Sequence, residues 1–214
     1  MMDFVIAIDG PAASGKGVLS ERLGKCLGLP VLDTGLLYRA VGARVMAGGG
    51  DPDDEATAAL AAAALDLVAL ADMDLAGAGA GELASRVAVH PRVRAVVYDL
   101  QRRFGLQPGG AILDGRDIGT VIFPEAPAKL FVTATPEVRA ERRWRQLVQR
   151  DPTLRLEQVL ADILARDARD SGRAVAPLRA APDAVLLDTT DLDIEQVFDA
   201  ALRIVEAARD RQGL

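Results

Sequence analysis

The sequence predicts an α/β protein built on a doubly wound parallel sheet of five strands. Five short apolar segments alternate with helical segments, which is the pattern of parallel strands joined by crossover helices. The first apolar segment runs directly into a glycine-rich loop and then a helix, as in phosphate-binding α/β domains. We find no repeat and no dividing linker in the 214 residues, so we expect a single domain over residues 1–214.

The first element is a buried strand over residues 4–8, followed by Gly10-x-x-x-x-Gly15-Lys16. The two glycines allow a tight turn and a close approach of backbone to ligand. Successive N–H groups and the start of the next helix then attract phosphate, and Lys16 adds charge for the outer phosphates. A glycine-rich turn without a ligand is the alternative, but the upstream strand and the lysine favour a nucleoside triphosphate site.

The helix after the loop is expected to end at Gly28. Cys26, the only cysteine, follows Leu19 and Leu23 at helical spacing, which predicts a buried core thiol.

A second short strand is expected over residues 31–32, and the turn at Asp33–Gly35 starts the next helix. Tyr38 and Arg39 then lie near the carboxyl end of that strand, where open α/β sheets bind ligands. A solvated helix charge is the alternative interpretation of Arg39.

The following region is expected to be helical and to carry little chemistry. Three glycines at 48–50 end one helix, and Asp51 with Pro52 is expected to begin another over the Ala/Leu-rich residues 56–71. Residues 77–81 form a glycine-rich break.

Residues 82–89 are expected to form a helix, and Pro91 to start the next one. Several polar groups suited to hydrogen bonding fall within this stretch: Ser85, Arg92, Arg94, Arg102 and Arg103. The arginines can be a solvated helix face, or an Arg and the Ser can point into a cleft and recognise a base.

The stretch around residues 111–117 is the second strong signal. Its apolar strand ends in Asp114, which is the position of an acidic residue that holds Mg²⁺ in phosphate-loop enzymes. Arg116 suits bidentate contact with a phosphate, and Asp117 can accept from an exocyclic amine such as cytosine N4. A salt-bridged turn is the alternative.

A strand over 129–133 is followed by a helix that Thr135 caps. Four arginines can share one face of this helix: Arg139, Arg142, Arg143 and Arg150. A further helix near 155–169 ends in the charged segment 166–173, which we interpret as a mobile lid that folds arginines over phosphates, in preference to a surface loop.

The chain closes with a strand at 184–188 and a helix for which Asp191 is the expected cap. The arginines outnumber what one nucleotide needs, so two phosphate-bearing substrates are expected. Phosphoryl transfer to a phosphate acceptor suits a chain whose only histidine is His90, because such an acceptor needs no general base.

Composition limits the other possibilities. A net charge of −6 and an isoelectric point near 4.9 argue against nucleic-acid binding. The chain has no Cys/His cluster for a metal and no apolar run of membrane-spanning length. We therefore expect a soluble cytoplasmic protein, monomeric and without nucleic-acid or membrane partners.

Four motifs together resemble the bacterial cytidylate kinases, phosphate-loop nucleoside monophosphate kinases. The motifs are residues 9–17, 32–39, 114–124 and 166–178, and the resemblance runs over most of the chain. It implies transfer of the γ-phosphate of ATP to CMP or dCMP with Mg²⁺. It also implies a core (about 1–40, 105–150 and 175–214), an acceptor-binding region (about 41–104) and a lid (about 151–174).

The resemblance also implies roles for individual residues. The residues implied for ATP are Gly10, Pro11, Ala12, Ala13, Ser14, Gly15, Lys16, Gly17 and Val18. Those implied for CMP are Thr34, Tyr38, Arg39, Ser85, Arg94, Arg116, Asp117, Arg166, Asp170 and Arg173. The catalytic candidates are Lys16, Arg116, Arg169 and Arg173, and Asp114 is the metal candidate, acting through water.

The sequence departs from this family in two places. Val18 stands where the family usually has Thr or Ser, so a hydroxyl near the phosphates is missing unless Ser14 or Ser20 replaces it. The family's strand-rich insert is replaced by the shorter Ala/Gly-rich residues 56–81. The alternatives are therefore a phosphate-loop kinase for another small acceptor such as UMP, or a nucleotide-binding regulator that has lost catalysis.

Overall fold

The computed structural model describes residues 4–66, 70, 73, 75 and 79–213. The chain forms two compact units, one of residues 1–32 and 102–214 and the other of residues 33–101. We refer to them as unit 1 and unit 2. Unit 1 contains the phosphate loop.

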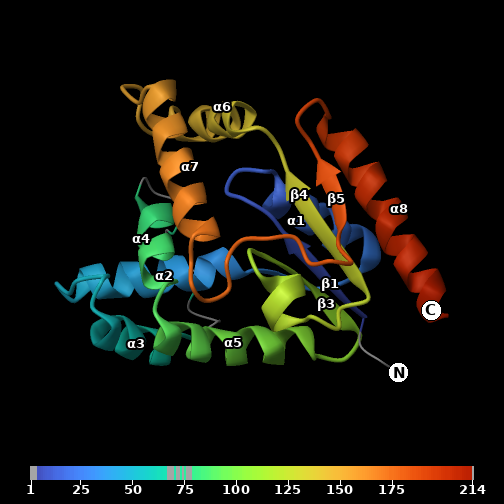
Figure 1. Cartoon of the computed structure of the whole chain (residues 1–214), viewed down its shortest axis with the longest axis horizontal. Helices are drawn as coiled ribbons and strands as arrows, with labels where there is room; N and C mark the ends of the chain where they lie inside the picture. Colours follow the sequence, from blue (N-terminus) through green and yellow to red (C-terminus); the bar gives the residue numbers. More distant parts are fainter. Residues whose placement is uncertain (1–3, 67–69, 71–72, 74, 76–78, 214) are drawn as a thin grey trace. The chain divides into compact units, whose positions relative to one another are not determined.

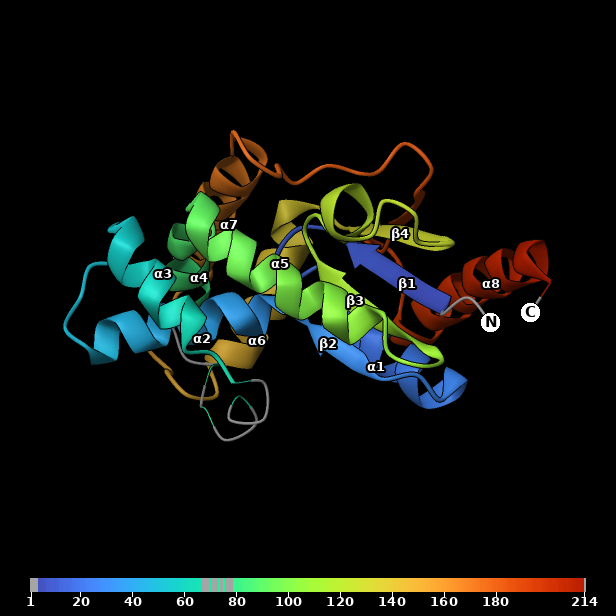
Figure 2. The ribbon, with the colours of Figure 1, turned by 90° about the horizontal axis from the view of Figure 1, so that it is seen from below.

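Unit 1 is built around a five-stranded sheet with the order β2-β3-β1-β4-β5 (Figures 1 and 2). The strands are β1 (Phe4–Asp9), β2 (Val31–Asp33), β3 (Gly110–Gly115), β4 (Ala128–Thr133) and β5 (Val185–Asp188). The registers of β1 with β3, β1 with β4, and β4 with β5 are all parallel. The predicted doubly wound α/β fold is confirmed, with all five strands at or within a few residues of their expected positions.

The central strand β1 determines where the site lies. Every residue of β1 is buried, since β3 and β4 flank it and helices cover the sheet. From β1 the chain crosses to β2 and returns to β3, which both lie on one side of β1. It then crosses to β4 on the other side, so the carboxyl end of β1 is the topological switch point. Open α/β sheets bind ligands at such points.

Helices α1 (Lys16–Leu27) and α8 (Ile194–Gln212) pack against one face of the sheet. Their apolar residues join the strand residues in one core that includes Ile6, Leu23, Leu130 and Val205. Arg22 of α1 adds two hydrogen bonds to Glu195 of α8. Burial of this aliphatic core supplies the main stabilisation of unit 1.

The helices α6 (Pro136–Leu147) and α7 (Leu156–Ser171) form a pair with its own small apolar cluster of Ala140, Val159 and Ile163. Ala13 of the phosphate loop packs against this cluster. As expected, Thr135 caps α6 by accepting from Val138 N at 3.4 Å. A short π-helical segment, η2 (Ile118–Ile122), follows β3.

Unit 2 is helical. It contains α2 (Thr34–Ala47), α3 (Glu55–Ala63), α4 (Ala80–Val87) and most of α5 (Pro91–Gly105). Gly42 allows α2 to approach α4 closely, because a Cβ at this position would lie 2.7 Å from Cβ of Leu83. The helices that were expected at 82–89 and from Pro91 are present.

The structure corrects four local predictions. Asp54, not Asp51, caps α3 by accepting from Thr57 N at 3.0 Å, because Asp51 instead binds Asp53 N and Arg86. The helix also ends at Ala63, well short of residue 71. Part of that stretch and residues 77–78 of the glycine-rich break lie outside the described residues, and the last two residues of the break, Ala80 and Gly81, begin α4. Two further corrections concern single side chains. Asp193 replaces Asp191 as the cap of α8, and Cys26 is exposed, because α1 turns that position away from the core.

None of the helices in the described part of the chain is long and apolar enough to cross a membrane.

Candidate functional site

The phosphate loop has a backbone that only particular residues allow. Gly10 has φ 150°, and a Cβ there would lie 1.9 Å from the carbonyl oxygen of Val132, so no side chain fits. Gly15 has φ 94° and Ala13 has φ 59°, both in the left-handed region. The loop therefore turns sharply, and left-handed residues of this kind are typical of backbone anion-binding nests.

Lys16 folds back over this loop. Its ammonium donates to the carbonyl of Pro11 at 2.9 Å, and the residue is only 6% exposed. The lysine that the sequence assigns to the outer phosphates is therefore a buried residue, and its ammonium is hydrogen-bonded to the backbone of the loop.

Position 18 has no hydroxyl, and the two serines that could replace it are Ser14 and Ser20. Val18 on α1 is 49% exposed. Ser14 and Ser20 are almost fully buried, and among the described residues neither hydroxyl oxygen has a hydrogen-bond partner. Ser14 lies in the loop itself and is the better-placed substitute for a hydroxyl at position 18.

Asp114 lies beside the loop at the end of β3. It is 4% exposed, and its Oδ2 is 3.9 Å from the position that a Cβ of Gly17 would occupy. A buried carboxylate next to a phosphate nest is the donor set that Mg²⁺ uses together with phosphate oxygens and water. Asp114 and the loop therefore fit a nucleotide-bound Mg²⁺.

Asp9, the last residue of β1, binds the segment after Asp114. Its two carboxylate oxygens accept from Ile118 N at 2.8 Å and from Gly119 N at 2.7 Å. Burial raises the pKa of the Asp9 carboxyl to about 7, against the lowering effect of these two N–H groups. Sequence reasoning assigned no role to this residue; an acidic side chain directly after five apolar strand residues was the available signal.

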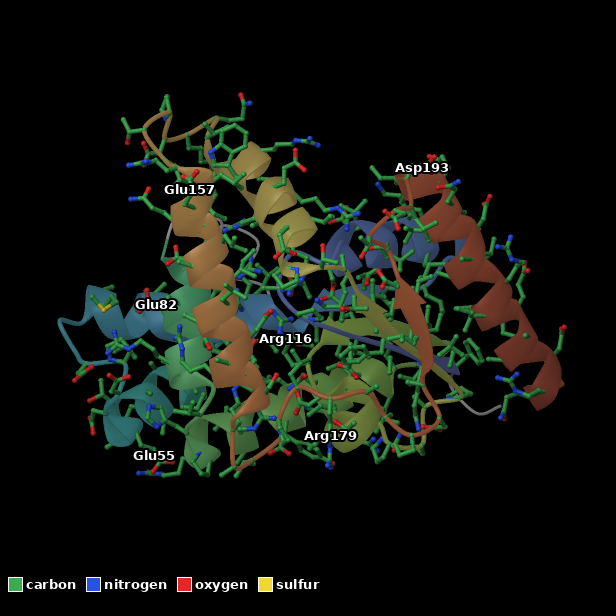
Figure 3. All side chains as sticks on the ribbon, turned by 45° about the horizontal axis from the view of Figure 1, so that its top comes forward. Glu55, Glu82, Arg116, Glu157, Arg179 and Asp193 are labelled. Carbon is green, nitrogen blue, oxygen red and sulfur yellow. The ribbon has the colours of Figure 1, made fainter. Side chains whose placement is uncertain are left out.

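Four charged side chains lie close together where the loop after β3 meets the end of α7. Asp170, 1% exposed, accepts from Arg116 Nε at 3.1 Å, pairs closely with Arg173, and lies 3.8 Å from Nε of Arg166. Figure 3 shows Arg116 beside α7. Three guanidinium groups around one carboxylate form a strongly basic cluster suited to a phosphate.

The helix expected to end near residue 169 extends into the charged segment 166–173, and Arg173 lies just beyond its end. Arg166, Arg169 and Asp170 lie in the last turns of α7, which continues to Ser171. The regular helix fixes the spacing of Arg166 and Asp170 at one turn, which places them together. Arg169, on the same turn, is half-buried.

Two of the arginines on α6, Arg139 and Arg142, form hydrogen bonds to other residues of unit 1. Arg139 donates to Ala134 O, Ala12 O and Asp167, and Arg142 donates to the hydroxyl and carbonyl of Thr189. The sequence assigned no role to Asp167, although it lies in the motif 166–178, or to Thr189, which lies in none of the four motifs. Contacts with the protein backbone explain why these two arginines lie where they do.

Unit 2 brings together most of the remaining residues expected to bind the acceptor. Thr34, Tyr38, Ser85 and Arg94 are all at least nine-tenths buried, and the Arg94 guanidinium lies 6.0 Å from the Tyr38 ring centre. Arg39 lies 3.7 Å from Asp33, the residue that caps α2. Buried hydroxyl and guanidinium donors of this kind are suited to a polar ligand.

Comparison with known proteins identifies the family. The family model of cytidylate kinase matches residues 6–207, nearly the whole chain. The chain belongs to the cytidylate kinase family. This membership confirms the resemblance that the four motifs suggested.

Relatives in the cytidylate kinase family support the assignment over the full length. The chain is 60% identical over 212 residues to a cytidylate kinase of Caulobacter sp. (strain K31), covering 99% of this chain and 98% of that protein. It is 63% identical over 205 residues to a cytidylate kinase of Xanthobacter autotrophicus, covering 96% and 98% respectively.

Solved structures show the same fold at low sequence identity. A gluconokinase from Sinorhizobium meliloti aligns with a TM-score of 0.51 and 14% identity, covering 98% of this chain and 95% of that one. This likeness shows that the two chains share the same α/β fold.

Proposed function

We propose that this protein transfers the γ-phosphate of ATP to CMP or dCMP, giving ADP and CDP or dCDP. Membership of the cytidylate kinase family and relatives of that name at 60–63% identity support the reaction. The observation that carries the proposal most directly is the cluster of three arginines on buried Asp170, in the same compact unit as the phosphate loop.

The donor side is assigned to residues 10–18. The N–H groups of the loop bind the phosphates of ATP, and Lys16 neutralises charge that develops on the transferring group. Val18 contributes its backbone N–H alone, so Ser14 is the side chain of the loop that can supply a hydroxyl.

Mg²⁺ bound with ATP supplies charge neutralisation of the phosphates, and Asp114 would hold it through water. The buried carboxylate beside Gly17 is the observation that supports this role. One carboxylate together with phosphates and water is a usual environment for Mg²⁺.

The acceptor-binding residues are those that the family resemblance implies. In unit 1, Arg116, Arg166 and Arg173 bind the acceptor phosphate and sugar with Asp170, and Asp117 accepts from the cytosine amine. In unit 2, Ser85 and Arg94 contribute to base recognition, while Thr34, Tyr38 and Arg39 are assigned to the acceptor phosphate. Arg169 and Arg173 are assigned to the transferring group.

The chemistry requires little from the protein beyond this. The acceptor phosphate oxygen is already anionic, so it attacks the γ-phosphorus without a general base. The γ-phosphorus bond to the ADP oxygen breaks as the new bond forms, and the leaving ADP carries the electron pair. The arginines and Lys16 stabilise the charge that is spread over the equatorial oxygens.

The test is an acceptor panel. Purified protein with ATP and Mg²⁺ is assayed for ADP release with CMP, dCMP, UMP and AMP, and the product is identified by chromatography. We expect kcat/KM for CMP or dCMP to exceed that for UMP and AMP. Comparable values for UMP would replace the cytosine assignment with a broader acceptor class.

A regulator that has lost catalysis is the remaining alternative, and it rests on Val18. Isothermal titration of ADP and CMP separates it from the kinase. Binding of both nucleotides with no CDP formed in the presence of Mg²⁺ would establish the regulator.

A further inference from the structure

Asp9 lies beside both ends of the turn that carries Arg116 and Asp117. In the parallel register of β1 with β3, Asp9 lies opposite Gly115, the residue before the turn. Its side chain accepts from the N–H groups of Ile118 and Gly119, the two residues after the turn, at 2.8 and 2.7 Å. One residue thus holds the chain on each side of the Arg116–Asp117 pair.

The surroundings leave Asp9 no room to move. It is 3% exposed, and a Cβ on Gly119 would lie only 3.4 Å from its Oδ2 and 3.2 Å from Cδ of Lys129. The next residue, Gly10, is fixed against the backbone of Val132. A change at Asp9 is therefore transmitted to the turn rather than absorbed by a shift of the carboxylate.

The backbone after the turn needs this carboxylate. The segment η2 begins at Ile118 with π-helical bonding, in which Phe123 N donates to Ile118 O five residues earlier. The first N–H groups of a helix have no partner within the helix, and here a side chain more than a hundred residues distant accepts from two of them. An Asp suits this position because its two carboxyl oxygens can each accept from one of the two N–H groups.

We propose that Asp9 is a positioning residue for acceptor recognition, which fixes the Arg116–Asp117 turn relative to the first residue of the phosphate loop. This inference rests on the proposed function, because it assigns the turn to CMP. It adds a residue from the donor side of unit 1 to the control of acceptor choice, although Asp9 itself touches neither substrate.

The charges that face Asp9 are consistent with this role. Lys16 from the donor side lowers the pKa of its carboxyl, and Asp117 from the acceptor side raises it. Lys129, whose stem lies beside Gly119, directs its ammonium to Asp183 and to the carbonyl of Pro124. The pKa of the Asp9 carboxyl is therefore shifted by one residue assigned to ATP and by one residue assigned to CMP.

The experiment compares Asp9→Asn with wild type. Asn has the same shape but one acceptor oxygen, so its NH₂ group faces one of the two N–H groups and displaces the turn. We measure kcat/KM for CMP and for UMP, KM for CMP, and the dissociation constant of ADP. We expect the CMP-to-UMP ratio to fall on the order of tenfold or more, with KM for CMP raised and ADP affinity changed less than threefold.

Two further variants make the test specific. Asp193→Asn replaces another aspartate that accepts a backbone N–H, that of Gln196 at the start of α8, and should leave the ratio unchanged. Gly119→Ala keeps the N–H donors but crowds the Asp9 carboxylate, so it should shift the ratio in the same direction as Asp9→Asn. If Asp9→Asn does not fold, Gly119→Ala decides the question by the same ratio.

The outcomes distinguish this inference from the function on which it rests. Wild type that does not phosphorylate CMP overturns the proposed function. Wild type that prefers CMP, together with an Asp9→Asn enzyme of unchanged CMP-to-UMP ratio, overturns the positioning role alone. A fall in kcat with every acceptor equally, or a parallel loss of ADP affinity, also overturns it and leaves Asp9 a structural residue.

Discussion

Nη2 of Arg139 on α6 lies 2.6 Å from Oδ2 of Asp167 on α7. The same guanidinium donates through Nη1 to the carbonyl of Ala12 in the phosphate loop, at 3.3 Å, and the residue is 3% exposed. Ala13 next to it packs on the apolar cluster of the two helices. The phosphate loop is thus attached to α7, the helix that carries Arg166 and Asp170 of the basic cluster.

Replacing Arg139 by Lys should therefore impair use of ATP. Lys retains the charge but cannot reach three acceptors at once, so the loop carbonyl or Asp167 loses its partner. We expect KM for ATP to rise on the order of tenfold in steady-state assays, with a smaller change in KM for CMP. The control is Arg145→Lys on the same helix, at a 67% exposed side chain paired with Glu141. Equal values for both variants would contradict the role.

The sequence was sufficient for the architecture but not for these contacts. The apolar strand pattern predicted five strands because buried parallel strands require continuous apolar runs. The phosphate loop was predictable because Gly10 and Gly15 are needed at fixed places in its backbone. The partners of Arg139 were not, because Ala12 and Asp167 are separated from it by 127 and 28 residues and only the fold brings them together.

The errors also have physical reasons. Asp51 and Asp191 were expected caps, but each has another aspartate two or three residues later that fits the first turn better, namely Asp54 and Asp193. The helix was expected to end near residue 169, with the charged segment 166–173 interpreted as a mobile lid, whereas α7 continues to Ser171. Ion pairs of Asp170 with the neighbouring arginines instead stabilise the helix to that point.

Lys16→Met should abolish most of the turnover. The ammonium is positioned by its 2.9 Å hydrogen bond to Pro11 O, and Met has a similar stem without the charge. Removal of one group that stabilises transition-state charge typically lowers kcat by a factor on the order of 10² to 10³. Lys25→Met, at an exposed position near the end of α1, should retain full activity. Circular dichroism of both variants verifies that the fold is retained.

Val18→Thr should strengthen binding of the donor. Position 18 is 49% exposed on the first turn of α1, so a Thr side chain fits without repacking the core. A new hydroxyl that reaches a phosphate or its Mg²⁺ would lower KM for ATP by about tenfold, since hydrogen bonds to charged groups contribute about 1.5–3 kcal/mol. Val18→Ala is the control, because it changes the size but adds no hydroxyl. No difference between Thr and Ala would show that Ser14 already supplies this contact.

Asp117→Asn should change the choice of acceptor. Asp117 is 5% exposed and follows Arg116 in the turn that Asp9 holds. A carboxylate accepts from the cytosine amine, whereas an amide can also donate to the carbonyl of uracil. We expect kcat/KM for CMP to fall on the order of ten- to a hundredfold, with that for UMP unchanged or raised. An unchanged preference for CMP would remove Asp117 from the site.

The stability of the fold should depend on pH through Asp9. The pKa of its carboxyl is raised from 3.8 to about 7 in the folded protein, mainly because burial disfavours the charged form. Between these two values the folded state binds more protons than the unfolded state. The contribution of Asp9 to stability is therefore fully present below about pH 4 and is lost as the pH rises toward 7, by about 1.4 kcal/mol per pH unit.

Urea unfolding of wild type and Asp9→Asn at pH 5, 6, 7 and 8.5 isolates this contribution, because Asn does not titrate and the other groups cancel in the difference. We expect wild type to lose stability relative to Asp9→Asn from pH 5 through pH 7, and the difference to level off toward pH 8.5, above the folded pKa. Asp188→Asn is the matched control, since hydrogen bonds from Thr190 lower the pKa of Asp188 below 3.8 and keep it ionised over the whole range. Its difference from wild type should be flat with pH. A flat difference for Asp9→Asn as well would mean that the two N–H groups outweigh burial and that Asp9 is ionised in the folded protein throughout this range.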